Sequence, residues 1–199
     1  MLSHVMVPTF DQVEVPVEKS DGAPRAHNLI PDLSSCRTAL QSVYDDPAAS
    51  EFAVQQALRD VMFAKLEQQT SMLWTVEEHM CHDAFMLDAQ VNNGGFAQWI
   101  YNRYFVRTMT TRMALQSIGA CWAVELLDEV VRALPGRIRS ALATNDVETL
   151  EDYRLPHRRE RLLDAIDDRY FEECRVRGED ASVTGLTVAY ARHNRVGLL

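Results

Sequence analysis

From about residue 34 onward, hydrophobic side chains recur every three or four positions, which is the spacing of one face of an α-helix. The clearest stripe lies within 71–91 and comprises Leu73, Val76, Met80, Ala84, Leu87 and Val91. Similar spacing predicts further helices over 34–44, 47–66, 106–118, 120–134, 156–177 and 182–194. In the helix over 156–177, the residues expected to face the core are Leu162, Leu163, Ile166 and Tyr170. No hairpin dipeptide separates alternating runs. The pattern therefore predicts an all-α fold, a single compact multi-helix bundle.

Capping and stop residues define where these helices should begin and end. Asp46-Pro47 is expected to supply the N-cap and first residue of the second helix. Asn92-Asn93-Gly94-Gly95 should end the helix over 71–91, because Asn and Gly tolerate the left-handed conformation of a C-cap. Pro135-Gly136 should stop the helix over 120–134, and Asn145-x-x-Glu148 resembles a capping box for a short helix.

Residues 1–33 differ from the rest of the chain. Four prolines punctuate them and their apolar pattern is weak, although the alternation of Val13, Val15 and Val17 fits one short strand. We predict an extended or disordered N-terminal arm at 1–33, followed by an all-helical domain at 34–199.

The composition fits one globular domain, with 199 residues of which 47% are hydrophobic and 25% charged. There is no run of about 18 apolar residues and no secretory signal, so we expect no membrane association. The four cysteines, Cys36, Cys81, Cys121 and Cys174, form no C-x-x-C pair. Free thiols favour a reducing compartment, and we expect a cytoplasmic protein.

The net charge of −9 is concentrated in the first half of the chain. Residues 1–100 hold 14 acidic and 5 basic side chains, whereas residues 101–199 hold 15 of each. The negative electrostatic field of such an acidic excess keeps a protein soluble, repels nucleic acid and attracts basic partners. We therefore expect a basic protein as partner and no direct nucleic-acid binding.

One motif resembles the signature of a known family. The run Asn92-Asn93-Gly94-Gly95-Phe96, with Gln98, Tyr101 and Asn102 after it, resembles the V-N-N-G-G-F-x-Q signature of the bacterial DNA-mimic protein domain family, first catalogued as a domain of unknown function. Two weaker segments follow in the order found in that family, Ser117–Ala120 and Leu163–Phe171. The resemblance covers about 50–195.

The resemblance implies an all-helical fold and an acidic protein, with a dimer in a founding member, that occupies the DNA-binding face of a transcription factor. This chain departs from the pattern at Ala97, where an acidic residue is usual, and at Trp99, where Phe is usual. Arg103, Arg107 and Arg112 also follow the signature directly, which argues against a continuous negative surface in that half.

Two sets of acidic residues are candidates for imitating phosphates, since carboxylates at i and i+4 of a helix lie about 6 Å apart and phosphates along a DNA strand about 7 Å apart. In the second half, Asp164 and Asp168 belong to a row with Glu160 and Glu172, although nearby arginines favour an ordinary solvated helix face there. The first-half set has few basic partners and is the better candidate. It consists of Asp60, Glu67, Glu77, Glu78, Asp83 and Asp88. We predict that these unpaired carboxylates lie together on one exposed wall.

Other polar and aromatic motifs have structural interpretations. The Asn-Asn-Gly-Gly turn is typical of a helix C-cap, although its amides could also bind an anion. The aromatic cluster after it, from Phe96 to Phe105, is typical of core packing, with a residue or two available to a dimer interface. His79 and Asp83 share a helix face and could begin a metal site, but a hydrogen-bonded pair is the favoured interpretation. With no nucleophile or base set, we expect no catalysis, cofactor or metal.

The leading hypothesis is therefore an acidic protein-binding domain, a DNA mimic that covers the nucleic-acid-binding surface of a transcription regulator or another DNA-binding protein. A first alternative is an immunity-type or accessory protein that neutralises a toxin or nuclease with the same acidic surface. A second alternative is an enzyme or helical metal-binding protein built on the His, Asp and Asn residues around His79 and Asp83.

Overall fold

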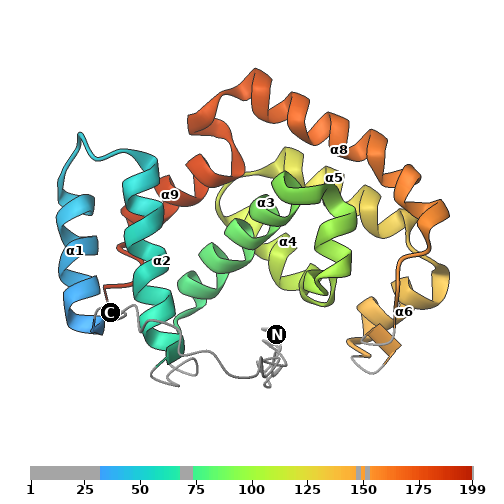
Figure 1. Cartoon of the computed structure of the whole chain (residues 1–199), viewed down its shortest axis with the longest axis horizontal. Coiled ribbons are helices and arrows are strands. Elements are labelled where there is room, and N and C mark those ends of the chain that lie inside the picture. The colour runs from blue at the N-terminus through green and yellow to red at the C-terminus, as the bar shows by residue number, and fades with distance from the viewer. Residues whose placement is uncertain (1–31, 68–73, 147–148, 151–152, 199) are drawn as a thin grey trace, which may run out of the picture.

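The computed structural model of the chain describes residues 32–67, 74–146, 149–150 and 153–198. In these ranges the ordered elements are eight α-helices and two short 3₁₀-helices, without a strand, so the predicted all-α bundle is confirmed (Figure 1). The arm predicted at 1–33 lies outside the described residues except for its last two. None of the described helices is long and apolar enough to cross a membrane.

The elements follow one another as α1 (Leu33–Asp45), α2 (Glu51–Glu67), α3 (Val76–Tyr101), η2 (Tyr104–Arg107), α4 (Thr108–Ser117), α5 (Cys121–Ala133), α6 (Gly136–Thr144), α8 (His157–Arg177), η3 (Glu179–Ala181) and α9 (Val183–Asn194).

Helix α3 is the central element, and it contacts α4, α8 and α9 (Figure 1). One hydrophobic cluster joins α3 to α4, α5, α6, α8 and the start of α9 and contains Trp99, Phe96 and Tyr170. A second cluster joins the α1–α2 hairpin to α9, with Leu40 and Leu58 at its centre. The hairpin therefore packs through a second core, shared with α9 and Cys81 of α3, at one end of the bundle.

The start of α2 differs from the prediction. Asp46 caps the C-terminal end of α1, and its carboxylate accepts a hydrogen bond of 2.8 Å from the backbone of Ala48. In this local turn an Asp side chain accepts a hydrogen bond from the backbone two residues later. The turn occupies residues that were predicted to begin the second helix. Helix α2 begins only at Glu51, after Ser50, whose hydroxyl accepts a hydrogen bond from the backbone of Ala53.

Helix α6 was not predicted. Pro135-Gly136 does end α5, but Pro135 also serves as the N-cap of α6, so one Pro-Gly pair separates two helices. After α6, Asn145 adopts the left-handed conformation at the C-cap. Asp146, one residue later than predicted, accepts the capping hydrogen bond from Thr149. Glu148, the other half of the predicted box, lies outside the described residues.

Two hydrophobic residues assigned to the core are exposed. Val76 is 50% exposed because it is the first residue of α3, and Leu162 is 56% exposed. Leu163, Ile166 and Tyr170 of α8 are buried as predicted. Leu162 is one helical position, about 100°, away from Leu163, which explains why it lies outside the buried stripe. Leu73 falls outside the described residues.

Candidate protein-binding surface

The Asn-Asn-Gly-Gly motif forms a kink inside α3 and does not end the helix. Gly94 and Gly95 have non-helical backbone angles, and helix resumes from Phe96 to Tyr101. Gly95 has a φ of +70°, and a β-carbon there would lie 2.1 Å from Oδ2 of Asp167 in α8. The backbone N–H of Phe96 donates a 2.8 Å hydrogen bond to Oδ1 of the same carboxylate. Glycine is therefore required at 95 both by backbone conformation and by the close approach of Asp167.

Asp88 of α3, one of the predicted binding residues, links α3 to α8 and α9. Its carboxylate accepts hydrogen bonds from Tyr170 of α8 at 2.6 Å and from Thr184 of α9 at 2.7 Å. Burial and the adjacent Asp88 charge raise the pKa of Tyr170, which keeps its hydroxyl protonated as a donor. The Tyr170 ring also meets Phe96 edge to face, at 5.8 Å between centroids. Asp88 is therefore a structural residue, and its partly buried carboxylate is occupied.

The remaining motif residues support the same junction. Asn92 is exposed and its side chain donates to the backbone carbonyl of Asp88, whereas Asn102 donates to the side chain of Gln90. Tyr101 is exposed and its hydroxyl donates to Glu160 of α8. Asn93 is exposed and Gln98 is partly buried. The structural interpretation of the motif thus fits these contacts, although the motif acts as a kink and not as a C-cap.

Glu78 and Asp83 were predicted on an exposed wall, and this prediction is wrong. Both are buried, because α3 turns them toward neighbouring elements. Glu78 forms an ion pair with the buried Lys65 of α2 and completes a capping box with Thr75. Asp83 binds the Arg107 guanidinium through both oxygens, at 2.8 and 3.1 Å. Burial raises the pKa of Asp83, but hydrogen bonding from His82 and the Arg107 charge outweigh it and lower that pKa below its ordinary value.

The other predicted acidic residues do not form one wall either. Asp60 is exposed on α2, whereas Asp164 and Asp168 are exposed on α8, at a different edge of the molecule (Figure 1). None of these three forms a hydrogen bond or ion pair within the described structure. Glu77 is partly buried, and the side chain of Glu67 lies outside the described residues. The first-half acids are therefore dispersed or internally paired.

The acidic row of α8 is partly neutralised, as expected for a solvated helix face. Glu172 pairs with Arg175 at 2.6 Å, and Arg169 pairs across to Glu129 of α5. Glu160 accepts from Tyr101. Asp164 and Asp168 remain available on the outer side of the helix, and we call these two residues the α8 pair.

A second acidic surface was missed because its members are far apart in the sequence. Glu51 at the start of α2 lies against Asp180 and Glu179 of η3. Burial and the charges of these two carboxylates raise the pKa of Glu51. Asp46 is in the adjoining α1–α2 turn, where Arg192 of α9 donates to several backbone carbonyls, including that of Ala49 at 2.8 Å. We call Asp46, Glu51, Glu179 and Asp180 the acidic edge.

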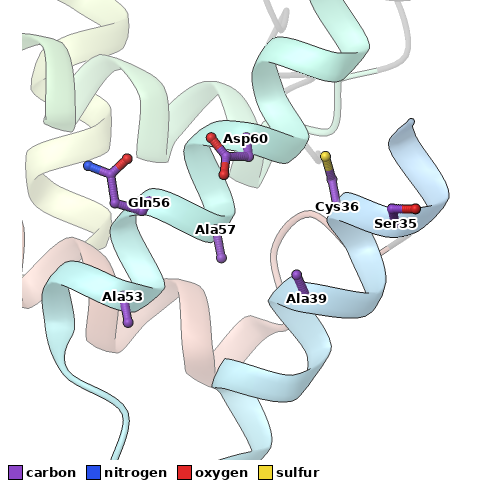
Figure 2. A pocket seen from close by; sticks show the side chains of 7 residues that line it. All are labelled: Ser35, Cys36, Ala39, Ala53, Gln56, Ala57 and Asp60. Carbon is purple, nitrogen blue, oxygen red and sulfur yellow. The ribbon is translucent and has the colours of Figure 1, made fainter. Parts of the chain in front are cut away.

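A shallow pocket of about 290 Å³ lies between α1 and α2 (Figure 2). Small side chains line it, with Cys36, Gln56 and Asp60 around them. Burial raises the pKa of the Cys36 thiol, and the charges of Asp60 and Asp32 raise it further. The thiol therefore stays protonated at neutral pH and is a poor nucleophile.

The histidines near Asp83 pack against an aromatic ring. The rings of His79 and His82 both lie 5.2 Å from that of Trp74. Burial and the Arg107 charge lower the pKa of His79, which favours the neutral imidazole. Among the residues that the structure describes, no three His, Cys, Asp or Glu side chains come close enough to hold a metal ion.

Comparison with known proteins connects this geometry to a family. The sequence model of a family described as DMP19-like protein matches residues 73–194, which is more than half of the chain. The chain belongs to the DMP19-like family. This is a family of DNA-mimic proteins, as the motif resemblance indicated. No curated protein and no solved structure matches the chain significantly.

The region matched by the DMP19-like family contains the whole α3 junction. The kink at Gly95, the Asp167 clamp and the Asp88 network all lie within 73–194. Helices α1 and α2 precede this region in the chain. The acidic edge uses both parts, with Asp46 and Glu51 from the hairpin and Glu179 and Asp180 from the matched region.

Proposed function

We propose that this protein is a cytoplasmic DNA mimic that binds the nucleic-acid-binding surface of a basic DNA-binding protein, such as a transcription regulator. It acts by competition with DNA and performs no catalysis. Membership of the DMP19-like family is the observation that carries this proposal. The acidic surfaces are where binding is expected.

The location of the available carboxylates supports a binding site different from the one expected from the sequence. Asp164 and Asp168 are four residues apart on one helix, a spacing of about 6 Å that approaches the separation of successive phosphates. The acidic edge adds four carboxylates, and Glu51 is held beside two like charges that disfavour its ionised form. A cation from a partner relieves this repulsion. The proposal therefore assigns binding to the α8 pair and the acidic edge.

The partner can be sought by affinity capture from cells of the source organism, followed by elution with rising salt. A DNA-binding protein that elutes at moderate salt supports the proposal, because association between exposed charges is screened by ions. The purified partner is then tested in a competition assay with its labelled DNA site. Failure of this protein to displace the DNA contradicts mimicry. A toxin or nuclease among the captured proteins favours the immunity-type alternative.

Charge variants locate the surface once a partner is known. Asp164→Asn/Asp168→Asn and Glu179→Gln/Asp180→Asn each remove two negative charges. Each double variant is expected to weaken partner binding several-fold and to flatten its salt dependence. Glu125→Lys on α5 is the matched control, because it changes the net charge by the same amount at an exposed site outside both surfaces. If the control weakens binding equally, only overall charge matters and the assigned surfaces are wrong.

A further inference from the structure

The α6 end of the molecule carries positive charge, in contrast to the acidic surfaces described above. The stretch 130–145 contains three arginines, Arg132, Arg137 and Arg139, and no acidic residue. All three are exposed, in the last turn of α5 and the first turn of α6. Arg161 of α8 is also exposed, and the N-terminal part of α8 lies at the same end of the molecule as α6 (Figure 1). We call these four residues the arginine end.

Three of the four guanidinium groups at this end take no part in the described contacts of the fold. Among the described contacts, Arg137, Arg139 and Arg161 form no hydrogen bond or ion pair. Arg132 donates only to the backbone carbonyl of Asp128. By contrast, many arginines elsewhere are paired, such as Arg107 with Asp83, Arg112 with Asp128 and Arg175 with Glu172. Three planar cations, those of Arg137, Arg139 and Arg161, are therefore available to an external anion.

The surroundings of the arginine end favour phosphates over an acidic protein surface. Stable protein interfaces contain buried apolar or aromatic anchors. Among the described residues of these segments, Leu162 is the one large hydrophobic side chain that is exposed. Binding to a nucleic-acid backbone needs no such anchor and relies on cations that neutralise phosphates. In addition, no side chain caps the N-terminus of α6, whose backbone dipoles favour an anion.

We infer that the arginine end binds the phosphate backbone of a nucleic acid, weakly and without sequence preference. The acidic edge and the arginine end occupy opposite ends of the molecule (Figure 1). The protein therefore contacts a DNA-binding protein through its carboxylates and nucleic acid through its arginines. This inference is independent of the proposed function, because it uses none of the same residues.

The test is fluorescence anisotropy with a labelled 20-base-pair DNA duplex of arbitrary sequence, using the full chain. If three phosphates are neutralised, affinity falls about 40-fold between 50 and 200 mM salt. Arg137→Gln/Arg139→Gln leaves about one contact, and the fall shrinks to about fourfold. The matched control is Arg175→Gln/Arg177→Gln, which removes the same charge with the same spacing at the other end of α8. It is expected to keep the wild-type salt dependence.

Three results would overturn the inference. The duplex could fail to bind at 20 mM salt, or the control pair could lose as much affinity as the α6 pair. Polyglutamate of equal charge could compete as well as unlabelled duplex, which would assign the arginines to an acidic protein. Circular dichroism checks that both pairs of variants are folded. Partner capture with the α6 pair separates the two proposals, since retained capture with lost duplex binding affects this inference alone.

Discussion

At the scale of single residues, the family motif is explained by contacts with a distant helix. Two separate constraints require glycine at position 95. Its φ is positive, and the carboxylate of Asp167 lies where a β-carbon would be placed. Asp167 also accepts from the backbone of Phe96, and so closes the gap in hydrogen bonding that the kink creates. The aspartate was visible in the sequence, but its partner 71 residues earlier was not, because such contacts depend on how α3 and α8 pack.

Gly95→Ala is therefore expected to destabilise the fold strongly. The left-handed backbone alone costs about 1–2 kcal/mol for an alanine, and displacing Asp167 adds the loss of a partly buried hydrogen bond, on the order of 1 kcal/mol. Gly119→Ala is the matched control, because Gly119 has a φ of +81° but no atom within 4 Å of the added β-carbon. Urea denaturation measures both. Equal losses of stability would mean that Asp167 contributes nothing to the requirement for glycine.

Asp167→Asn is expected to stabilise the protein at neutral pH. Burial raises the pKa of Asp167, the Phe96 hydrogen bond opposes this, and the charges of Asp164 and Asp168 raise it further. A raised folded-state pKa means that stability is lost as pH rises from the unfolded value near 3.8 through the folded value. Asparagine keeps an acceptor for Phe96 and avoids this loss, so its advantage should disappear below about pH 3.8.

Asp146→Asn provides a control of opposite sign for this pH dependence. Hydrogen bonds from Thr149 lower the pKa of Asp146, so its contribution is present above the unfolded pKa and is lost as pH falls through the folded value. The asparagine variant should therefore be less stable than wild type at neutral pH. Thermal unfolding of both variants between pH 3 and 7 gives the comparison. A pH-independent effect of Asp167→Asn would rule out the charge argument.

At the scale of helices, local periodicity predicted most elements but not the exposure of their polar faces. Helices α1, α5, α8 and α9 were predicted within about two residues, since each has a regular apolar stripe and clear end signals. Glu78 was misplaced, although Thr75-x-x-Glu78 is a capping box that marks the true start of α3. The burial of its carboxylate against Lys65 depends on the packing of α2, which no local pattern encodes.

The buried pair of Lys65 and Glu78 leads to a prediction about how α2 is attached to α3. Lys65→Met leaves a buried carboxylate without its cation, which is expected to cost about 3–5 kcal/mol. The double variant Lys65→Met/Glu78→Gln removes both charges and should recover a large part of that loss, since the glutamine can still accept from Thr75. A double-mutant cycle by chemical denaturation measures the coupling. Additive effects of the two single changes would show that the ion pair is not coupled.

At the scale of the whole molecule, the sequence predicted the sign of the charge but not its distribution. The chain carries a net charge of −9, and the acidic excess lies in the first half of the sequence. In the folded chain Glu78 and Asp83 are buried, the Asp88 carboxylate is hydrogen-bonded, and Glu51 lies against Glu179 and Asp180. Charge counted along the chain therefore gave no reliable location for a binding surface. The arginine end was missed for the same reason, because the sequence does not show which arginines of the second half pair with an acidic residue.

The C-terminal tail is one of the links that join the hairpin to the DMP19-like region. Tyr44 donates to the carbonyl of Val196 at 2.8 Å, and Arg195 pairs with Asp45. Gly197 packs so closely that a β-carbon would lie 2.8 Å from Leu40. Burial raises the pKa of Tyr44 above its ordinary value, so its hydroxyl remains a donor across the neutral range.

Deletion of residues 195–199 should therefore loosen α1 and α2 while leaving the rest of the fold intact. The loss of one buried hydrogen bond and of the apolar contacts of Val196 is on the order of 2–4 kcal/mol. The deletion also removes the exposed ion pair of Arg195 with Asp45. Hydrogen–deuterium exchange is expected to accelerate across 33–67 and to stay unchanged in α4 and α5, whose core cluster has no tail residue. Tyr44→Phe should produce a smaller change of the same pattern. Uniform acceleration across all helices would instead mean that the two clusters unfold as a single cooperative unit, with the hairpin inseparable from the matched domain.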